Sequence, residues 1–479
     1  MKKIFLLIIS VVLLTSCNDW LGINSDPNKA TNVAPDVLFG YAITSWSAGR
    51  TGGDQYIPLV FAGQTMSTAG AYGWGNDDVY TISPYSTGNT WKLYYATAGT
   101  NILSAIKLAE SSTPKQPWIA AQCKIVRAML MYEATTLYGD VPYSEAWSDV
   151  SYPKFDNQKD ILNNLLLLLD EAIAEAQETS PDGYKTISTY DLYYGGDMSK
   201  WIKLENSMKL KIAMLMVDAD PTKASLIGDL VTNGNLISSS SDNMLFPFFN
   251  IAGKENPKYG ILKKYANSQN LFFFANKTVV DILQTTEDPR LSIYFTPGDD
   301  ANGKIISIPT NDEGDATIAT VNLSTILKPD APDILFTLQE ILFYKAEAYA
   351  RGLGVAKDLV KADGYYKDGI KAALKYYGVA DDVATNYVNT KIQSLTASAD
   401  PTVDIHTQQW VDLMDRPIEA FTQWRRSGID GSEVPALALP ANAPANPLFR
   451  RYLYSDDEAS ANPNTPQDVH YYDKMWFDK

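Results

Sequence analysis

The sequence predicts a mostly α-helical protein, a tetratricopeptide-like (TPR-like) α-superhelix with long irregular loops and little β-structure. Three observations support this fold class. Apolar residues recur at helical spacing over several long segments. Two stretches of the chain each hold a pair of such segments, as tetratricopeptide repeats do. Long polar stretches rich in glycine, proline and asparagine separate the helical segments.

The chain opens with the pattern of a secretion signal. Lys2 and Lys3 precede an apolar run that ends at Leu14, and two small residues and then Cys17 follow it. The apolar run is too short to span a bilayer. Leucine, two small residues and cysteine form a lipobox, which predicts removal of residues 1–16 and a lipid on Cys17. An ordinary secretion signal with a chance cysteine is the alternative.

The segment after Cys17 predicts a tether to the membrane. Residues 17–35 are polar and turn-rich and show no apolar period, so we expect an extended link. Acyl chains bury at about 0.8 kcal/mol per CH₂, so two or more can hold a protein on a membrane. No other window approaches the roughly twenty apolar residues of a spanning helix. Residues 36–479 are expected to form a single helical body.

The composition limits the classes of partner. The chain has 40 basic and 56 acidic residues and a formal charge of −16, which makes nucleic acid a poor partner. Its 29 tyrosines and 10 tryptophans combine a flat apolar face with a polar tip, which suits ligand-binding surfaces. More than half of these rings are expected to pack between helices instead.

The stretch from Trp118 to Gln177 holds the first predicted helix pair. The first helix carries a stripe of Ile125, Met129 and Tyr132. In the second helix, five consecutive leucines begin at Leu165 and point around more than one face, so this helix must be covered on two sides. Cys123 lies on an apolar stripe, and we expect a buried and unreactive thiol.

A single amphipathic helix and a second pair follow. The single helix has a stripe of Trp201, Leu204, Met208, Ile212 and Leu215. The first helix of the pair, expected to end near Gly352, has a stripe of Leu335, Leu338, Leu342, Ala346 and Tyr349. Its partner has a stripe of Leu359, Ala362, Tyr366, Ile370, Ala373 and Tyr377. A short glycine turn between the two segments is typical of a helical repeat.

Irregular blocks separate these helices. They span residues 70–88, 180–200, 246–274, 296–332 and 437–479. Long loops on a rigid frame are uncommon unless they bind a ligand or order against the frame. We therefore expect the binding site within these blocks.

Six strings along the chain resemble the SusD/RagB family, in the branch called SusD-like type two. They are Leu21 to Asn28 after the predicted lipidated cysteine, Leu137 to Tyr143, Asp288 to Leu291, Gln409-Trp410, Trp424 to Arg426, and Arg450 to Tyr452 with Glu458 and Asn462. Each string is weak alone, but together they follow the family's order over nearly the whole chain. We expect them to serve the fold: Gly139 would end a helix, Asp288-Pro289 would mark a helix boundary, and Trp424 would lie in the core.

The resemblance implies a surface lipoprotein of the Bacteroidetes outer membrane that acts in nutrient uptake and catalyses no reaction. Such a protein sits as a lid on a SusC-like TonB-dependent barrel, captures an oligosaccharide, and delivers it for import. Some members of the family capture peptides. A TPR-type scaffold that binds only protein, and a glycosidase, are the alternatives from other functional classes.

The loop from Gly70 to Trp91 is the first candidate for a sugar site. Its aromatic residues Tyr72, Trp74, Tyr80 and Tyr85 alternate with glycines and with polar residues that include Asn76 and Asp77. Glycines beside an aromatic ring allow the ring to face outward, and sugars stack their C–H faces on such rings. Trp74, between two glycines, is the first choice as a platform. Trp91 continues into a helical stripe and is expected in the core.

The segment from Phe246 to Phe274 is the second candidate. It offers Phe249, Asn250 and Tyr259 as ligand contacts. The alternative is a loop held on the helices by its own phenylalanines.

The sequence gives little support for catalysis. His406 and His470 lie apart, and zinc, thiol and serine-hydrolase motifs are missing from the sequence. We expect no cofactor. Acidic turns near Asp299 and Asp312 lack the spacing of a calcium loop. A glycosidase needs only two carboxylates, so an assay for new reducing ends separates that alternative from a binding protein.

Replacing Trp74 with alanine is expected to leave folding intact and to weaken ligand binding. Each ring contact contributes roughly 0.5–1.5 kcal/mol beyond buried area, by analogy with aromatic pairs. Titration of the variant with the true ligand measures the loss. An unchanged affinity would remove Trp74 from the site.

Overall fold

Helices form most of the protein. The computed structural model describes residues 33–68, 77–299, 301–310, 314–440, 442–445 and 447–479. The helices of this part are α2 (Pro35–Arg50), α3 (Tyr56–Ala62), α4 (Pro84–Lys92), α5 (Ala98–Ser111), α6 (Pro117–Tyr138), α7 (Gln158–Ala176), α8 (Met198–Met216), α9 (Lys223–Asn233), α10 (Pro257–Ala266), α11 (Lys277–Thr285), α12 (Arg290–Tyr294), α13 (Leu338–Arg351), α14 (Leu359–Tyr376), α15 (Asp381–Thr390), α16 (Pro401–Asp412), α17 (Pro417–Arg426) and α18 (Asp456–Ala461). The predicted signal and Cys17 lie outside the described residues.

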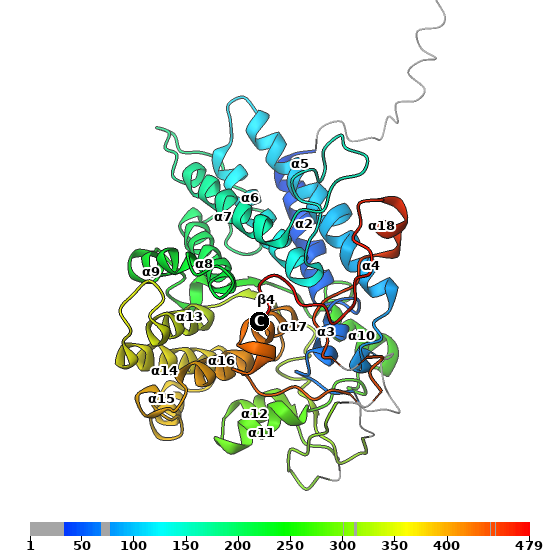
Figure 1. Cartoon of the computed structure of the whole chain (residues 1–479), viewed down its shortest axis with the longest axis vertical. Coiled ribbons are helices and arrows are strands. Elements are labelled where there is room, and N and C mark those ends of the chain that lie inside the picture. Colours follow the sequence, from blue (N-terminus) through cyan, green and yellow to red (C-terminus); the bar gives the residue numbers. More distant parts are fainter. Residues whose placement is uncertain (1–32, 69–76, 300, 311–313, 441, 446) are drawn as a thin grey trace, which may run out of the picture.

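Neighbouring helices stack in pairs, as the sequence predicted. The two predicted pairs, α6 with α7 and α13 with α14, pack along their lengths, and α2 packs against α5 in the same way. Figure 1 shows the stack continuing from α5, α6 and α7 through α8 and α9 to α13 and α14, while the C-terminal segment crosses the middle of the molecule. This arrangement confirms the mostly α-helical, TPR-like fold class.

The leucine-rich helix α7 is covered on two sides, by α6 and α8. Four of its five consecutive leucines are buried, and Leu167 is the exposed one. On α6, Cys123 is buried and free, and burial raises the pKa of its thiol. The thiol is therefore protonated and unreactive, as expected. Trp91 and Trp424 are buried as well, which confirms their predicted place in the core.

The prediction that Leu335 begins a helix is wrong. Leu335 lies in strand β4 (Asp333–Phe336), which pairs antiparallel with β1 (Met244–Phe246). Helix α13 begins only at Leu338, because Thr337 and Glu340 form a capping box that satisfies the first free backbone N–H groups. The other small sheet pairs β2 (Phe295–Thr296) with β3 (Thr320–Val321).

Two of the blocks predicted to be irregular contain a helix. Helix α10 lies within residues 246–274 and α18 within residues 437–479. Asn256 and Ser455 cap these helices through their side chains, a polar signal that the search for apolar stripes did not weigh. Gly139 ends α6 with φ of 81°, and Asp288-Pro289 precedes α12, as predicted.

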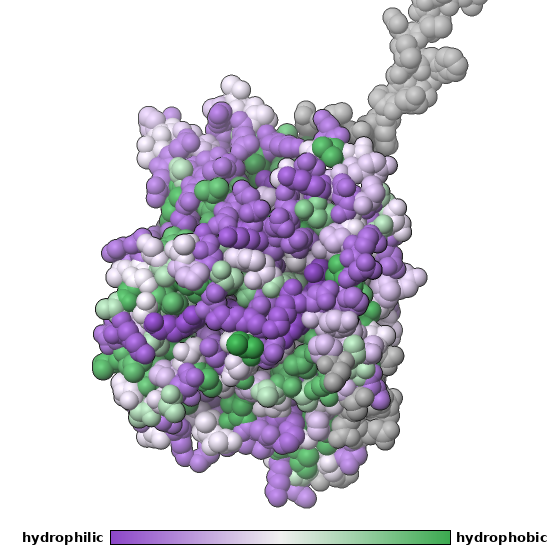
Figure 2. All heavy atoms as spheres, viewed as in Figure 1, coloured by the Kyte–Doolittle hydropathy of each residue, from purple (hydrophilic) through white to green (hydrophobic). Residues whose placement is uncertain are grey.

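One face of the protein is largely hydrophilic. Figure 2 shows hydrophilic residues in a broad band across the middle of one face, with apolar residues gathered mainly below the band. Within the described ranges, every helix is too short or too polar to cross a bilayer.

Buried charges join elements that are distant in the sequence. The guanidinium of Arg50 on α2 forms ion pairs with Glu133 on α6, with Asp333 on β4 at 3.0 Å and with Glu419 on α17 at 3.3 Å. All four side chains are almost completely buried. An isolated buried charge costs several kcal/mol, so these groups must keep their partners inside the protein.

Glu205 on α8 is a buried carboxyl that lacks this compensation. It is fully buried, and neither carboxylate oxygen has a hydrogen-bond partner among the described residues. Burial raises its pKa to about 8, while Lys209 opposes the shift and Asp170 adds to it. The native protein therefore holds a proton that the unfolded chain, with a pKa near 4.5, releases.

Replacing Glu205 with glutamine is expected to stabilise the protein at alkaline pH. A raised pKa means that the wild type loses stability as the pH rises from about 4.5 to about 8. Glutamine has the shape of the neutral acid and removes this loss, by roughly 1–3 kcal/mol at pH values near 8.5. Denaturant unfolding between pH 5 and 8.5 measures the difference.

The matched control is Glu178→Gln, which changes an exposed carboxylate after α7. The free energy of unfolding of that variant should equal that of the wild type at every pH in this range. If the free energy of unfolding of Glu205→Gln and of the wild type depended on pH in the same way, Glu205 would not bind the extra proton.

Candidate ligand-binding site

An aromatic hollow lies between α4 and the C-terminal segment. Its volume is about 90 Å³. Residues from both sides line it, namely Tyr80, Ile82, Pro84, Thr87, Phe449, Tyr452, Leu453, Tyr454, Asp456 and Tyr471. The hollow therefore combines the end of the first candidate loop with a segment close to the end of the chain.

Ring contacts shape the wall of the hollow. The ring centroid of Tyr80 lies 5.8 Å from those of both Phe449 and Tyr471. Phe449 and Tyr471 are nearly parallel, with centroids 6.1 Å apart. Aromatic pairs at these distances stabilise one another, so the rings are fixed before any ligand arrives.

Backbone hydrogen bonds hold the C-terminal wall on the helical frame. Arg450 and Arg451 each donate their backbone N–H to the carbonyl oxygen of Tyr471, at 2.8 and 3.0 Å. The backbone N–H of Tyr452 donates to the carbonyl oxygen of Leu137 at the end of α6, at 2.8 Å. An irregular segment tied in this way presents its side chains as rigidly as a helix does.

The hydroxyl groups of Tyr80 and Tyr454 stay neutral. Burial raises the pKa of Tyr80, and the hydrogen bond from Gln64 opposes this only in part. Burial also raises the pKa of Tyr454, against the effect of the nearby Arg451. Neutral phenols can donate or accept hydrogen bonds, and the exposed Asp456 adds a carboxylate at the edge. The hollow can therefore stack an apolar face and bond to hydroxyl groups.

The structure describes only part of the first candidate loop. Tyr72, Trp74 and Asn76 lie outside the described residues, and so does the side chain of Asp77, whose backbone starts a 3₁₀ turn (Asp77–Val79). These four ligand contacts stay predictions.

Two other residues of this loop are described. Tyr80 lies at a positive φ of 67° and is buried, so it contributes to the wall of the hollow and is no free platform. Tyr85 on α4 is 82% exposed, next to Pro84 in the lining. Tyr85 is therefore the described aromatic residue of this loop that is free to meet a ligand.

The second candidate segment lies apart from the lining. Phe249 and Asn250 are exposed in a turn after β1, and Tyr259 on α10 is half-buried and donates its hydroxyl to Ser268 at 3.2 Å. None of the three lines the hollow. Phe246 and Phe274 at the ends of the segment are buried, as expected for a loop that its own phenylalanines hold in place.

The sequence pattern did not single out Phe449, Tyr452, Tyr454 and Tyr471. They belong to the block 437–479, which was predicted to be irregular, and its aromatic residues are the signal that was available. Among the described residues, no three histidine, cysteine or acidic side chains come together as a metal site would need.

The chain is similar to known proteins both in sequence and in fold. A family model described as "Starch-binding associating with outer membrane" (SusD-like_2) matches residues 27–454. A solved structure named as a chitin-binding protein has a TM-score of 0.77 at 25% identity, covering 93% of this chain and 100% of that one. No curated protein matches the chain.

Two further structures show the same fold. A SusD/RagB family protein from Bacteroides thetaiotaomicron has a TM-score of 0.77 at 21% identity, covering 93% of this chain and 99% of that one. A chitin-binding SusD homolog from Flavobacterium johnsoniae has a TM-score of 0.75 at 18% identity, covering 93% and 97%.

Proposed function

The chain belongs to the SusD-like family of nutrient-binding proteins associated with the outer membrane, and from this premise we propose that it captures a glycan at the cell surface. It then delivers the glycan to a SusC-like TonB-dependent barrel, and the sugar leaves the protein chemically unchanged. The lipid on Cys17 and the tether of residues 17–35 keep the protein on the outer leaflet beside its transporter.

The aromatic hollow is the observation that carries this proposal. Pyranose rings have C–H groups on one face and hydroxyls at the edge, so they bind where fixed aromatic rings adjoin polar groups. The hollow offers both, in the half-buried ring of Tyr471 and the carboxylate of Asp456. Trp74 and Tyr85, from the same loop, complete the site as outward platforms.

The name of one similar structure supports a choice of glycan. The chitin-binding protein covers 93% of this chain at 25% identity, and the family model is described as starch-binding. Chitin fragments and starch fragments are therefore the first glycans to test. A volume of about 90 Å³ is well below that of a pocket for a drug-sized ligand, so one sugar unit at most would enter the hollow and the remainder of the glycan would lie across the surface.

Calorimetric titration with chito-oligosaccharides, malto-oligosaccharides and a peptide panel tests the function. We expect binding of one glycan class with micromolar to millimolar affinity, because two or three ring contacts supply only a few kcal/mol. If only peptides bound, the nutrient captured by this protein would be a peptide and not a glycan. Binding to the barrel without any small ligand would indicate a protein-binding scaffold, and new reducing ends would indicate a glycosidase.

Replacing Tyr85 with alanine is expected to weaken glycan binding roughly twofold to tenfold, the equivalent of one ring contact. Because Tyr85 is 82% exposed, the melting temperature should not change. Tyr41→Ala on α2 is the control, since Tyr41 is also largely exposed, at 56%, and does not line the hollow. Equal losses in the two variants would place Tyr85 outside the site.

A further inference from the structure

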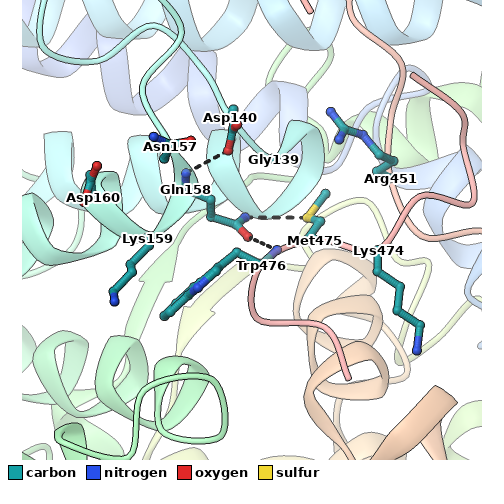
Figure 3. A pocket seen from close by; sticks show the side chains of 10 residues that line it. All are labelled: Gly139, Asp140, Asn157, Gln158, Lys159, Asp160, Arg451, Lys474, Met475 and Trp476. Carbon is teal, nitrogen blue, oxygen red and sulfur yellow. Dashed lines mark hydrogen bonds between the residues drawn. The ribbon is translucent and has the colours of Figure 1, made fainter. Parts of the chain in front are cut away.

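A separate and more polar hollow opens where the start of α7 meets the end of the chain. Its volume is about 460 Å³. Figure 3 shows Trp476 from the C-terminal segment below Gln158 and Lys159 in the first turn of α7, while the side chain of Lys474 extends away from them. Neither the candidate loop nor α4 contributes to its lining, so it is distinct from the aromatic hollow.

Gln158 gives this hollow a rigid floor. The side chain of Gln158 is buried, donates to the carbonyl oxygen of Thr135 at 2.6 Å and accepts the backbone N–H of Trp476 at 3.0 Å. The backbone N–H of Gln158 donates to the carboxylate of Asp140 at 2.8 Å. Figure 3 shows the backbone of Gln158 bonded to Asp140 and its side-chain amide bonded to Met475 and to the backbone of Trp476. The position of Trp476 is thereby fixed relative to α6 and α7.

The indole ring of Trp476 is only half-buried and keeps an unused donor. No residue in the described part of the chain accepts a hydrogen bond from its Nε1–H, and this N–H is not among the buried polar atoms without a partner, so it is open to solvent or to a ligand. The ammonium of Lys159 lies 5.9 Å from the ring centroid. Figure 3 shows the ring and the Lys159 side chain extending toward the same side of the hollow. The ring thus offers a flat face beside polar groups.

The polar groups around the ring are of mixed charge. Asn157, Lys159 and Asp160 are exposed at the start of α7, and the Asn157 side chain does not cap the helix. Lys474 is balanced by an ion pair with Asp430 at 2.9 Å. The lining also includes Arg451, whose guanidinium donates to the carbonyl oxygen of Tyr138. Beside the flat ring itself, the amide of Asn157, the carboxylate of Asp160 and the ammonium of Lys159 match the hydroxyl groups of a sugar.

We propose that this Trp476 hollow is a second saccharide-binding subsite, in which a neutral pyranose unit stacks on the indole and bonds to Asn157 and Asp160. The proposal rests on the proposed glycan-binding function and extends it to a second position on the protein. The segment 450–454 separates the two hollows: Arg451 lines the polar one, while Tyr452 and Tyr454 line the aromatic one. A glycan long enough to reach both subsites gains affinity through effective concentration.

The test is calorimetric titration of the purified protein with chitobiose and chitohexaose, and with maltose and maltohexaose. Trp476→Ala should remove one binding event and weaken binding of the hexasaccharide at least tenfold. Binding of the disaccharide at the aromatic hollow should persist. Trp476→Phe keeps a flat ring and should retain most of the affinity.

Two further variants keep the test independent of folding. Asp160→Asn changes an exposed side chain in the first turn of α7 and should weaken hexasaccharide binding several-fold without changing the melting temperature. Trp118→Ala is the matched control, because Trp118 is also half-buried, donates to the carbonyl oxygen of Glu178 and lines neither hollow. It should bind both sugars as the wild type does.

The outcomes separate this proposal from the proposed function. If the wild type binds glycan at one site and both Trp476→Ala and Asp160→Asn bind it equally well, the second subsite is overturned while glycan capture stands. If the wild type binds none of the four sugars and binds peptides instead, glycan capture and the second subsite are both overturned.

Discussion

The buried guanidinium of Arg50 is the interaction on which the helical stack depends. It neutralises carboxylates from α6, β4 and α17, and Glu419 in turn lies 3.7 Å from the buried ammonium of Lys211 on α8. Burial alone would raise the pKa of Glu419, but Arg50 and Lys211 lower it to about 2. The desolvation cost of each buried charge is offset only while its ion-pair partners stay in place. Any shift of one helix along its neighbour would leave a charge unpaired, so the network fixes the register of elements that apolar packing alone would allow to slide.

The same reasoning connects the frame to the ligand-binding segments. Arg425 on α17 is fully buried and donates to the carbonyl oxygens of Thr136 on α6 and of Arg450, at 2.6 and 3.0 Å. Arg450 is paired with Asp478 at 2.5 Å. The irregular C-terminal chain is therefore held by the hydrogen bond from Arg425 on α17 and by its own ion pair between Arg450 and Asp478. Both hollows take a wall from this chain, so the precision of their aromatic residues derives from the helical core.

The sequence was a good guide to the helices and a poor guide to the site. Apolar residues on the buried face of a helix recur in the sequence with a period near 3.6 residues. For this reason α6, α8 and the core position of Trp424 could be predicted. Leu335 fitted that period by coincidence, and the Thr337 cap decided the true boundary. The contact of Tyr80 with Phe449 joins distant parts of the chain, and no local pattern predicts such a meeting.

A capture protein gains from placing its binding rings on irregular segments clamped to helices. Loops can vary in sequence without disturbing the stack, whereas the rings of Trp91 and Trp424 on helices α4 and α17 are buried and serve packing. Clamping removes most of the entropy cost of ordering the loop when the ligand binds. Arg451 shows how close the two roles lie: its guanidinium donates to the carbonyl oxygen of Tyr138 at the end of α6, and it stands over the ring of Tyr454 at 5.1 Å. The Arg451 side chain thus caps the C-terminal end of α6 and holds the segment between the two hollows in place. A substitution of Arg451 would therefore make both binding surfaces less rigid.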